Sequence, residues 1–556
     1  MKVADYIIEW LSSKGVTDIF TVSGGGSIVL CDAVGRSNLM NYFCCHHEQA
    51  VAFAAEGYSR ETGRIGVSLV TTGPGGTNAI TGVSSSYLDS IPMMFISGQA
   101  YSNQTIKKSG LRQLGVQEIN IIELVKPNTK YAVMLKSPND IRYELEKAYH
   151  KAISGRPGPV WIDIPADHQL ADITPEKLRA YKGKAKKKPA NGSSFEALTR
   201  KMRLSKRPLI LAGHGIKLAG AEEELIKLIE KLNIPVLTTW NATDLIRSDH
   251  RLFIGRPGAF GERGANFAIQ NADFILSIGS RLPYMVTGYN VEDFGRNAFK
   301  AMVDIDKKEI KKSAKIIDYS CTSDARVFLK EFNSFCKNDW RYDNKWLDYC
   351  QSVRNRYPIL PENYLKSDQH VNSYLFVRIL SKLLNQNTTI VTDMGLSFVG
   401  THQAFRIKTG QKLFTNSGHA PMGWGLPAAF GASVQNKEKN VICLTGDGGL
   451  MMNIQELATV MCHRPNIKIF IYNNKGYLTI KQTQQRGFNS RLMGSTDDGD
   501  MKFPDFNLLA KAHSLPFLKI KNDFELDKIE QFVNINGPAI CELIMDPEQL
   551  QIPIAI

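Results

Sequence analysis

Residues 441–474 read VICLTGDGGLMMNIQELATVMCHRPNIKIFIYNN, and this stretch decides how the rest of the fold is interpreted. An apolar run, a Gly-Asp-Gly-Gly turn, a helical pattern and a second apolar strand follow one another, which predicts a βαβ unit. The residues expected on the inner face of its helix are Ile454, Leu457, Ala458 and Met461. Because βαβ crossovers are right-handed and join parallel strands, Asp447 and Asn474 should emerge at the same carboxyl edge of the sheet.

A carboxylate and a carboxamide at one sheet edge suit a hard divalent cation that also binds phosphate oxygens. Mg²⁺ prefers oxygen ligands at ~2.1 Å and often takes some of them from a diphosphate. Gly446, Gly448 and Gly449 would let the backbone approach those oxygens, and the next helix offers the positive end of its dipole. With Asn473 and Asn474 at a fixed distance beyond the turn, the stretch resembles the thiamine diphosphate motif. An ordinary glycine-rich turn is the alternative.

The composition is that of a globular protein with several domains. The 556 residues are too many for one hydrophobic core, and three domains are the natural expectation. No apolar run approaches the ~20 residues that cross a bilayer, so we expect a soluble protein without a membrane partner. Nine cysteines form no Cys-x-x-Cys pair, which argues against zinc and disulfides and favours a reducing cytoplasm. Much of the net charge of +14 lies in residues 182–188 and 307–315, and it favours anionic cofactors and substrates over nucleic acid.

The first third of the chain, residues 1–175, alternates helical and strand patterns and predicts a parallel α/β domain. Glu48 follows a strand pattern and begins a helix, so it should lie at a sheet edge. An acidic residue at a helix start is favoured by the helix dipole alone. The sharper hypothesis is that a carboxylic acid in a mostly apolar site hydrogen-bonds a ligand nitrogen.

Two stretches make the resemblance specific, HHEQAVAFAAEGYSRETG at residues 46–63 and VTTGPGGTNAITGVSSSYLDSIPMMFISGQ at residues 70–99. They resemble the pyrimidine-binding domain of the thiamine diphosphate-dependent enzymes, in the acetolactate synthase branch. In that family the glutamate at the position of Glu48 protonates N1′ of the aminopyrimidine, which promotes the imino tautomer that deprotonates C2 of the thiazolium. The resemblance therefore implies a catalytic role for Glu48.

The same resemblance implies roles for three further residues. Gly25 and Gly26 match the family's glycine loop, which approaches the reaction centre, and Gln117 matches a glutamine that faces substrate. A surface glutamine is the alternative for Gln117. Residues 73–76, Gly-Pro-Gly-Gly, lack the Gly-Lys-Ser/Thr ending of a phosphate loop, and the family uses them as a packing turn.

The middle of the chain is expected to contain a linker and a central Rossmann-like domain. Residues 176–194 are rich in Lys, Ala, Pro, Gly and Ser and read as the linker. In acetolactate synthases the domain that follows holds the ADP portion of FAD, but residues 279–288, GSRLPYMVTG, lack the second arginine and the acidic pair found after the position of Arg281. FAD and an empty central domain therefore both stay open. Residues 336–370 are expected to wrap the surface.

The last domain is expected to bind the diphosphate. The resemblance places Met422 under the cofactor, where a bulky side chain bends the two rings into a V shape, and it assigns a backbone contact to the carbonyl of Ala420. The predicted cofactor-binding residues are Gly395, Leu396, Ser397, Ala420, Met422, Gly446, Asp447, Gly448, Gly449, Asn474, Gly476, Tyr477 and Leu478, with Asp447, Asn474 and Gly476 as the metal ligands.

The resemblance covers nearly the whole chain and implies an α/β fold of three doubly wound parallel-sheet domains: a pyrimidine-binding domain at residues 1–175, the central domain at 195–335 and a diphosphate-binding domain at 365–548. It implies homodimers or homotetramers with active sites between subunits.

The implied activity is that of a carboligase, which decarboxylates a 2-oxo acid such as pyruvate and adds the two-carbon unit to a second carbonyl compound. Acetolactate synthases carry a tryptophan at the position of Thr483, and threonine suits a larger or more polar acceptor, such as a keto sugar nucleotide. A plain decarboxylase or lyase and an inactive cofactor-binding subunit are the alternatives.

Overall fold

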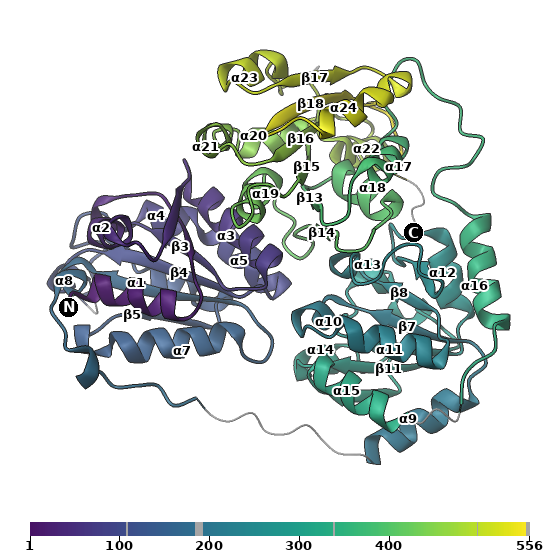
Figure 1. The fold of residues 1–556 in the computed structure, drawn as a ribbon, viewed down its shortest axis with the longest axis horizontal. Helices are drawn as coiled ribbons and strands as arrows, with labels where there is room; N and C mark the ends of the chain where they lie inside the picture. Colours follow the sequence, from purple (N-terminus) through teal and green to yellow (C-terminus); the bar gives the residue numbers. More distant parts are fainter. Residues whose placement is uncertain (107–108, 184–192, 337–339, 498, 552–556) are drawn as a thin grey trace.

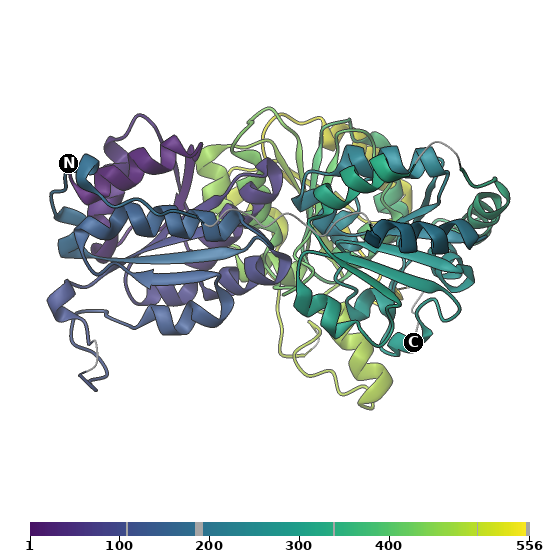
Figure 2. The same ribbon diagram turned by 90° about the horizontal axis from the view of Figure 1, so that it is seen from below.

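The computed structural model describes residues 1–106, 109–183, 193–336, 340–497 and 499–551. It contains three six-stranded sheets in which every pair of neighbouring strands is parallel, and helices cover the sheets. Figure 1 shows three lobes, the N-terminal one in purple and blue, the central one in teal and the C-terminal one in green and yellow. The N-terminal and central lobes lie at opposite ends in both views, and Figure 1 shows the C-terminal lobe above them (Figures 1 and 2). The predicted α/β class with three parallel-sheet domains is confirmed.

The N-terminal sheet has the strand order β2-β1-β3-β4-β6-β5. Its strands are β1 (Asp18–Thr21), β2 (Asn41–Cys44), β3 (Gly66–Val70), β4 (Met93–Gln99), β5 (Tyr131–Met134) and β6 (Pro159–Pro165). Its helices are α1 (Val3–Ser13), α2 (Ile28–Arg36), α3 (Glu48–Thr62), α4 (Pro74–Asn78), α5 (Ile80–Asp89), α6 (Ile121–Val125), α7 (Ile141–Ile153) and α8 (Ala166–Leu170). Strands β3, β4 and β6 are buried along their whole length, which explains their continuous apolar sequences.

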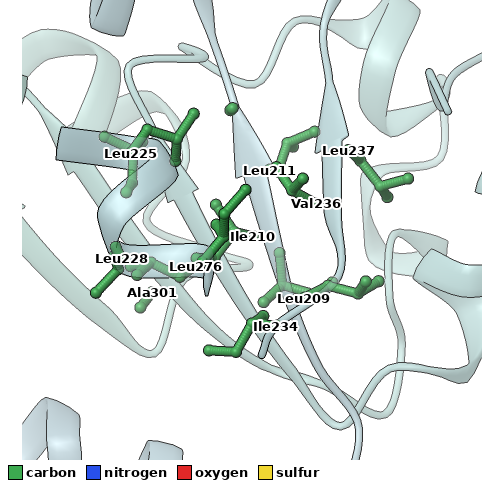
Figure 3. Packing of buried hydrophobic residues seen from close by; sticks show 14 of the residues in the cluster. Leu209, Ile210, Leu211, Leu225, Leu228, Ile234, Val236, Leu237, Leu276 and Ala301 are labelled. Atoms are coloured by element: carbon green, nitrogen blue, oxygen red, sulfur yellow. The ribbon is translucent and has the colours of Figure 1, made fainter. Parts of the chain in front are cut away.

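The central sheet has the order β12-β11-β10-β7-β8-β9. Its strands are β7 (Pro208–Ala212), β8 (Val236–Thr238), β9 (Phe253–Gly255), β10 (Phe274–Ile278), β11 (Phe299–Asp304) and β12 (Tyr319–Thr322). Its helices are α9 (Ser193–Leu204), α10 (His214–Leu218), α11 (Glu222–Leu232), α12 (Arg263–Asn271), α13 (Tyr284–Thr287), α14 (Lys307–Lys312), α15 (Ala325–Phe335) and α16 (Lys345–Arg356). Figure 3 shows Leu225 and Leu228 of α11 packed near Ile210 of β7 and Leu276 of β10. Most of the predicted linker, residues 184–192, lies outside the described chain.

Helix α16 differs from the expectation that residues 336–370 only wrap the surface. It packs against α12 and β9, and it buries Trp346, Leu347 and Cys350 in the core of the central domain. The indole N–H of Trp346 donates a hydrogen bond of 2.8 Å to the carbonyl of Pro208. The apolar residues of this helix are few and its sequence is otherwise polar, so its burial was not evident from the pattern.

The C-terminal sheet has the order β14-β13-β15-β16-β18-β17, which is the order of the N-terminal sheet strand for strand. Its strands are β13 (Thr389–Thr392), β14 (Lys412–Phe414), β15 (Val441–Gly446), β16 (Ile467–Asn473), β17 (Phe517–Ile520) and β18 (Ala539–Ile544). Its helices are α17 (Ser373–Leu383), α18 (Leu396–Ala404), α19 (Gly425–Ser433), α20 (Asp447–Met452), α21 (Glu456–His463), α22 (Leu478–Gly487), α23 (Phe506–Ala512) and α24 (Ile529–Val533). In the described part of the chain, no helix is long and apolar enough to cross a bilayer.

The predicted βαβ unit is present, but the prediction of a single helix between its strands is wrong. The chain forms α20, breaks at Asn453 and continues as α21. Leu457 is fully buried as expected, whereas Met461 is 38% exposed. The break has a physical cause, because the side chain of Asn453 leaves the helix surface and donates a hydrogen bond of 2.9 Å to the carbonyl of Gly423.

Helices α3 and α19 hold the N-terminal and C-terminal domains together. A Cβ on Gly57 of α3 would lie 2.1 Å from the carbonyl oxygen of Ala428, and a Cβ on Gly431 of α19 would lie 1.8 Å from that of Ala54. Each helix therefore needs glycine where the backbone of the other passes. The crossing places the first turn of α3, where Glu48 lies, next to the C-terminal domain.

Candidate active site

Asp447 and Asn474 meet at the carboxyl edge of the C-terminal sheet, as the βαβ unit predicts. Strands β15 and β16 are neighbours in register, with Gly446 opposite Tyr472, so the residues that follow each strand lie together. The carboxylate of Asp447 accepts a hydrogen bond of 2.7 Å from the N–H of Gly448 and one of 3.1 Å from the N–H of Gly476. The three predicted metal ligands are therefore brought to one place.

The electrostatics of this edge fit a bound cation. Asp447 is 1% exposed, and burial raises the pKa of its carboxyl group to about 7, although backbone N–H groups oppose the shift. Asn474 is buried as well, and its Oδ1 atom has no hydrogen-bond partner among the described residues. A buried acceptor without a donor next to a buried carboxylate is satisfied by a hard cation such as Mg²⁺.

The glycines of the turn are required by close neighbours. A Cβ on Gly448 would lie 2.0 Å from the ring of Tyr477, and a Cβ on Gly449 would lie 2.5 Å from Oδ2 of Asp393. At Gly446 the nearest atom to such a Cβ is 3.9 Å away, so the backbone there is open to a ligand. The turn is thus tightly packed at Gly448 and Gly449 and open at Gly446.

Asp393 is a buried residue of this edge that the sequence argument missed. It follows β13, and its carboxylate accepts hydrogen bonds from the N–H groups of Met394 (2.9 Å) and Gly423 (3.1 Å) and from the hydroxyl of Thr445 (2.9 Å). Burial raises its pKa to about 6. It ties together three segments of the predicted cofactor site. Its only sequence signal was an aspartate directly after a buried strand.

Gly395, Leu396 and Ser397 begin helix α18 at the same edge. Gly395 has φ +77°, which favours glycine, and the hydroxyl of Ser397 donates to the carbonyl of Met394 at 3.0 Å. The side chains of Leu396 and Leu478 are 4% and 5% exposed and belong to the hydrophobic core. These two leucines can therefore offer a ligand only their backbone.

The loop that carries Ala420 and Met422 lies between β14 and α19. Ala420 is exposed and has φ +57°, and Met422 is partly buried. The N–H groups of His419 and Ala420 point at Oδ1 of the buried Asn416, at 3.2 and 3.3 Å. The loop is therefore held from its inner side and leaves its outer side accessible.

Glu48 is the first residue of α3 and is 9% exposed. The helix starts there because the ring nitrogen Nδ1 of His47 accepts a hydrogen bond of 3.1 Å from the N–H of Gln49. The side-chain amide of Asn78 donates to Oε2 of Glu48 at 3.0 Å. Asn78 was not among the predicted site residues, although it belongs to the Gly-Pro-Gly-Gly-Thr-Asn stretch.

Gly25, Gly26 and Gln117 gather around the turn that begins at Gly73. The N–H of Gly26 donates to the hydroxyl of Thr71 at 3.1 Å, and Gly25 is exposed. Gln117 is exposed with φ +58°, and its carbonyl oxygen lies 2.4 Å from where a Cβ on Gly73 would be. The structure therefore places these three candidates beside the same turn.

The sequence neighbours of Glu48 contact the C-terminal domain of the same chain. The N–H of His46 donates to the carboxylate of Glu456 at 3.0 Å, and the amide of Asn453 donates to Oε1 of Gln49 at 3.1 Å. These contacts flank Glu48 on both sides. They fasten the start of α3 to the break between α20 and α21.

Thr483 lies on α22 and is exposed, with its hydroxyl donating to the carbonyl of Thr479 at 2.9 Å. In Figure 2 this light green helix extends from the lower edge of the molecule. Ile480 and Phe488 are 48% and 54% exposed, so apolar side chains accompany Thr483 on this projection.

A cavity of about 1630 Å³ lies at the carboxyl edge of the central sheet, where all three domains contribute to its wall. Gly213 and Gly279 pack the turns after β7 and β10 together, and Asp304 and Arg281 supply a carboxylate and a cation. Burial raises the pKa of Asp304. A carboxylate and glycine turns at this edge are the arrangement that binds dinucleotides in α/β sheets.

Comparison with known families assigns all three domains. Residues 1–124 match the thiamine pyrophosphate enzyme N-terminal TPP binding domain, residues 195–332 match the central domain, and residues 393–543 match the C-terminal TPP binding domain. Thiamine pyrophosphate (TPP) is another name for thiamine diphosphate.

Curated relatives align along nearly the whole chain. A probable acetolactate synthase large subunit of Methanococcus aeolicus is 32% identical over 98% of this chain and 92% of its own length. The acetolactate synthase large subunit of Lactococcus lactis is 30% identical over 99% and 93%. Acetolactate synthase 1, chloroplastic, of Zea mays is 30% identical over 100% and 87%.

Proposed function

Because the chain belongs to the thiamine pyrophosphate enzymes, in their acetolactate synthase-like branch, we propose that it is a Mg²⁺-dependent carboligase. It decarboxylates a 2-oxo acid, pyruvate by preference, and transfers the two-carbon unit to a second carbonyl compound. The observation that carries the proposal is the unpartnered, buried Oδ1 of Asn474 beside the buried carboxylate of Asp447. This pair suits a hard cation, and the open backbone at Gly446 supports a diphosphate beside it.

Residues of the C-terminal domain would hold the cofactor. Asp447, Asn474 and the carbonyl of Gly476 would bind Mg²⁺, and the N-terminus of α18 at Gly395 would receive the diphosphate. Met422 would support the bent cofactor from the loop after β14. When bound, thiamine diphosphate supplies the carbon nucleophile and accepts the electron pair that remains when carbon dioxide leaves.

Residues of the N-terminal domain would hold and transfer a proton at the aminopyrimidine ring of the cofactor. Glu48 presents its carboxyl group at a helix start in a buried setting, and Asn78 orients it by donating to one oxygen. Glu48 would hold a proton at the ring nitrogen N1′ of the aminopyrimidine and exchange it during turnover. Gly25 would keep the approach to the reacting carbon free, because it carries no side chain and is exposed.

The acceptor has a second candidate, a keto sugar nucleotide. Thr483 is exposed on α22, whereas the acetolactate synthase pattern has tryptophan there, so the wall beside the acceptor is smaller and more polar. The net charge of +14 favours a phosphate-bearing acceptor. A plain decarboxylase or lyase would use the same residues without an acceptor.

FAD in the central cavity is a further part of the proposal. The cavity of about 1630 Å³ is large enough for a dinucleotide, and Asp304 at the end of β11 is placed to accept hydrogen bonds from a ribose. Absorbance of the purified protein between 350 and 500 nm, before and after incubation with FAD, tests this assignment. No bound flavin after incubation would remove FAD from the proposal.

We further propose that the active form is a homodimer or homotetramer with active sites between subunits. Large apolar side chains are exposed on the N-terminal domain beside Gln117, at Leu111, Leu114 and Val116, and on the C-terminal domain at Met452. Exposed apolar groups next to a predicted site suit a subunit interface. Sedimentation velocity should give a species of at least two chains, and a monomer at all concentrations would contradict this point.

A product screen tests the proposed activity and separates the acceptors. The purified protein is incubated with thiamine diphosphate, Mg²⁺ and pyruvate, alone or with other 2-oxo acids or a 4-keto sugar nucleotide, and products are identified by mass spectrometry. Acetolactate from pyruvate alone identifies pyruvate as acceptor, and a two-carbon adduct of the sugar nucleotide identifies the second candidate. No turnover of any 2-oxo acid would refute the proposed function.

A further inference from the structure

Asn416 holds the loop that carries Ala420 from a fully buried position. Its Oδ1 accepts the N–H groups of His419 and Ala420 at 3.2 and 3.3 Å. Its Nδ2 donates to Oε1 of Glu56 at 2.9 Å and to the hydroxyl of Ser85 at 2.5 Å. Asn416 belongs to the C-terminal domain, whereas Glu56 and Ser85 belong to the N-terminal domain. The side chain of Asn416 therefore connects the loop to the N-terminal domain.

Asp89 holds the same loop at its neighbouring residues. Its Oδ2 accepts hydrogen bonds from the N–H of Ser417 (3.1 Å), from Arg60 (2.6 Å) and from Asn241 of the central domain (3.0 Å). A Cβ on Gly418 would lie 2.4 Å from Oδ1 of Asp89. The loop is therefore pressed against Asp89 and has no room to shift toward it.

The groups behind the loop form a buried and charged network. Arg60 bridges Glu56 and Asp89, with side chains 3%, 0% and 2% exposed. Burial disfavours the Arg60 cation, but the two carboxylates outweigh burial and raise its pKa. The indole of Trp424, two residues beyond Met422, donates to Oε2 of Glu56 at 3.1 Å. A fully partnered network in a low-dielectric interior is rigid, because breaking any bond leaves a buried charge unsatisfied.

We infer that Asn416 and Asp89 are positioning residues for the reaction: they fix the backbone of residues 416–420 and thereby the carbonyl of Ala420 toward the aminopyrimidine. This inference rests on the proposed function. All three domains contribute to the hydrogen bonds that hold this loop, through Asn416, Asp89 and Asn241. The φ of +57° at Ala420 is uncommon for a non-glycine residue and persists only where surrounding bonds impose it.

The first test measures the loop without any cofactor. In wild-type protein the amides of His419 and Ala420 are protected by Asn416, so hydrogen–deuterium exchange of peptides covering residues 416–424 should be slow. Asn416→Ala should speed this exchange about tenfold, the effect of losing a net hydrogen bond. The matched control is Thr389→Val, which removes a buried bond of 2.8 Å to Glu61 on the same α3 helix but does not touch the loop. In the control the exchange of this segment should stay within about twofold of wild type.

A second variant removes no side chain of the buried network. Gly418→Ala inserts a methyl group against Asp89 from the partly exposed loop, so it displaces the loop without deleting any buried polar group. It covers the case in which Asn416→Ala fails to fold. Exchange in the same peptides should rise as it does in Asn416→Ala.

The kinetic test separates positioning from simple stability. With thiamine diphosphate, Mg²⁺ and pyruvate, both loop variants should lose at least about tenfold in kcat while KM for pyruvate changes less than about threefold, because a misplaced group impairs the chemical step. Thr389→Val should lower the Tm but keep kcat. Normal exchange in both loop variants, or fast exchange with wild-type kcat, would overturn the inference. Absence of turnover in wild type would count against the proposed function instead, since the exchange test does not depend on it.

Discussion

At the scale of single residues, the Oδ1 atom of Asn474 is a buried acceptor without a hydrogen-bond donor among the described residues. A buried acceptor without a donor costs on the order of 1–3 kcal/mol, and a cation removes that cost. Asn474→Ala should therefore weaken Mg²⁺ binding in the presence of thiamine diphosphate by at least about tenfold, measured by isothermal titration calorimetry. The neighbouring Asn473→Ala is the control, because the amide of Asn473 is already partnered: it donates to Glu542 at 2.7 Å and accepts from the N–H of Lys475 at 3.2 Å. Equal losses in the two variants would refute the assignment.

The role proposed for Glu48 is proton transfer and not stabilisation of the fold. Glu48→Gln keeps the size of the side chain but cannot exchange a proton, so kcat should fall by about 100-fold or more while thiamine diphosphate still binds. Glu61→Gln provides the comparison, since Glu61 is another buried carboxylate on α3 that pairs with Lys412 and Lys439. Its activity should persist with a lower Tm. Near-normal turnover in Glu48→Gln would contradict the role.

The positions of Glu48, Asp447 and Asn474 could be predicted from the sequence, because each follows a strand or begins a helix within a recognisable local pattern. Their roles stay predictions. Asn78 and Asn416 were missed, because their partners are 30 and 360 positions away and no local pattern records such a pairing. Side-chain amides of this kind become visible only when the chain is folded.

At the scale of elements, the crossing of α3 and α19 depends on glycines, which let the two helix backbones come close together. Gly431→Ala would place a methyl group 1.8 Å from a backbone oxygen, which no rotamer can relieve, so the apparent Tm should fall by several degrees. Gly35→Ala on α2 is the matched control, because its methyl group would meet nothing within 4 Å and alanine favours a helix by about 0.5–1 kcal/mol. An unchanged Tm for Gly431→Ala in differential scanning fluorimetry would disprove the close contact.

Strand β6 contains a buried carboxyl group, Asp163, that makes stability depend on pH. Ser97 and Gln99 of β4 donate to it, but burial dominates and raises its pKa to about 7. The folded state therefore holds the proton more tightly than the unfolded chain, and this stabilisation is complete below about pH 4 and lost as the pH rises to 7. Relative to Asp163→Asn, wild type should lose about 1.4 kcal/mol of unfolding free energy per pH unit over that range. Parallel pH profiles in urea titrations would contradict the shift.

Elements were predictable in proportion to their length and burial. Strands β3 and β6 have five and seven buried residues, which give a continuous apolar signal. Strands β9 and β14 have three residues each, too few for a periodic signal, and were missed. The break between α20 and α21 was also missed, because it depends on the bond from Asn453 to Gly423 and not on any helix-breaking residue.

At the scale of the whole molecule, two domains whose sheets have identical strand order are joined by helices α3 and α19 and by buried polar groups. The N-terminal and C-terminal domains share the order 2-1-3-4-6-5 when each is numbered from its own first strand. Glu56, Arg60 and Asp89 reach from the first domain to the loop after β14, and Asn241 adds the central domain. Three α/β units were foreseeable from the alternating pattern. Their arrangement was not, because it depends on these long-range contacts.

The central claim is that this arrangement decarboxylates a 2-oxo acid with thiamine diphosphate and Mg²⁺. The most direct measurement is the release of ¹³C-labelled carbon dioxide from [1-¹³C]pyruvate by the purified full-length protein, with and without each cofactor. We expect release only when both cofactors are present, and its loss in Glu48→Gln. Release that does not depend on thiamine diphosphate, or no release from pyruvate or any other 2-oxo acid, would contradict the account.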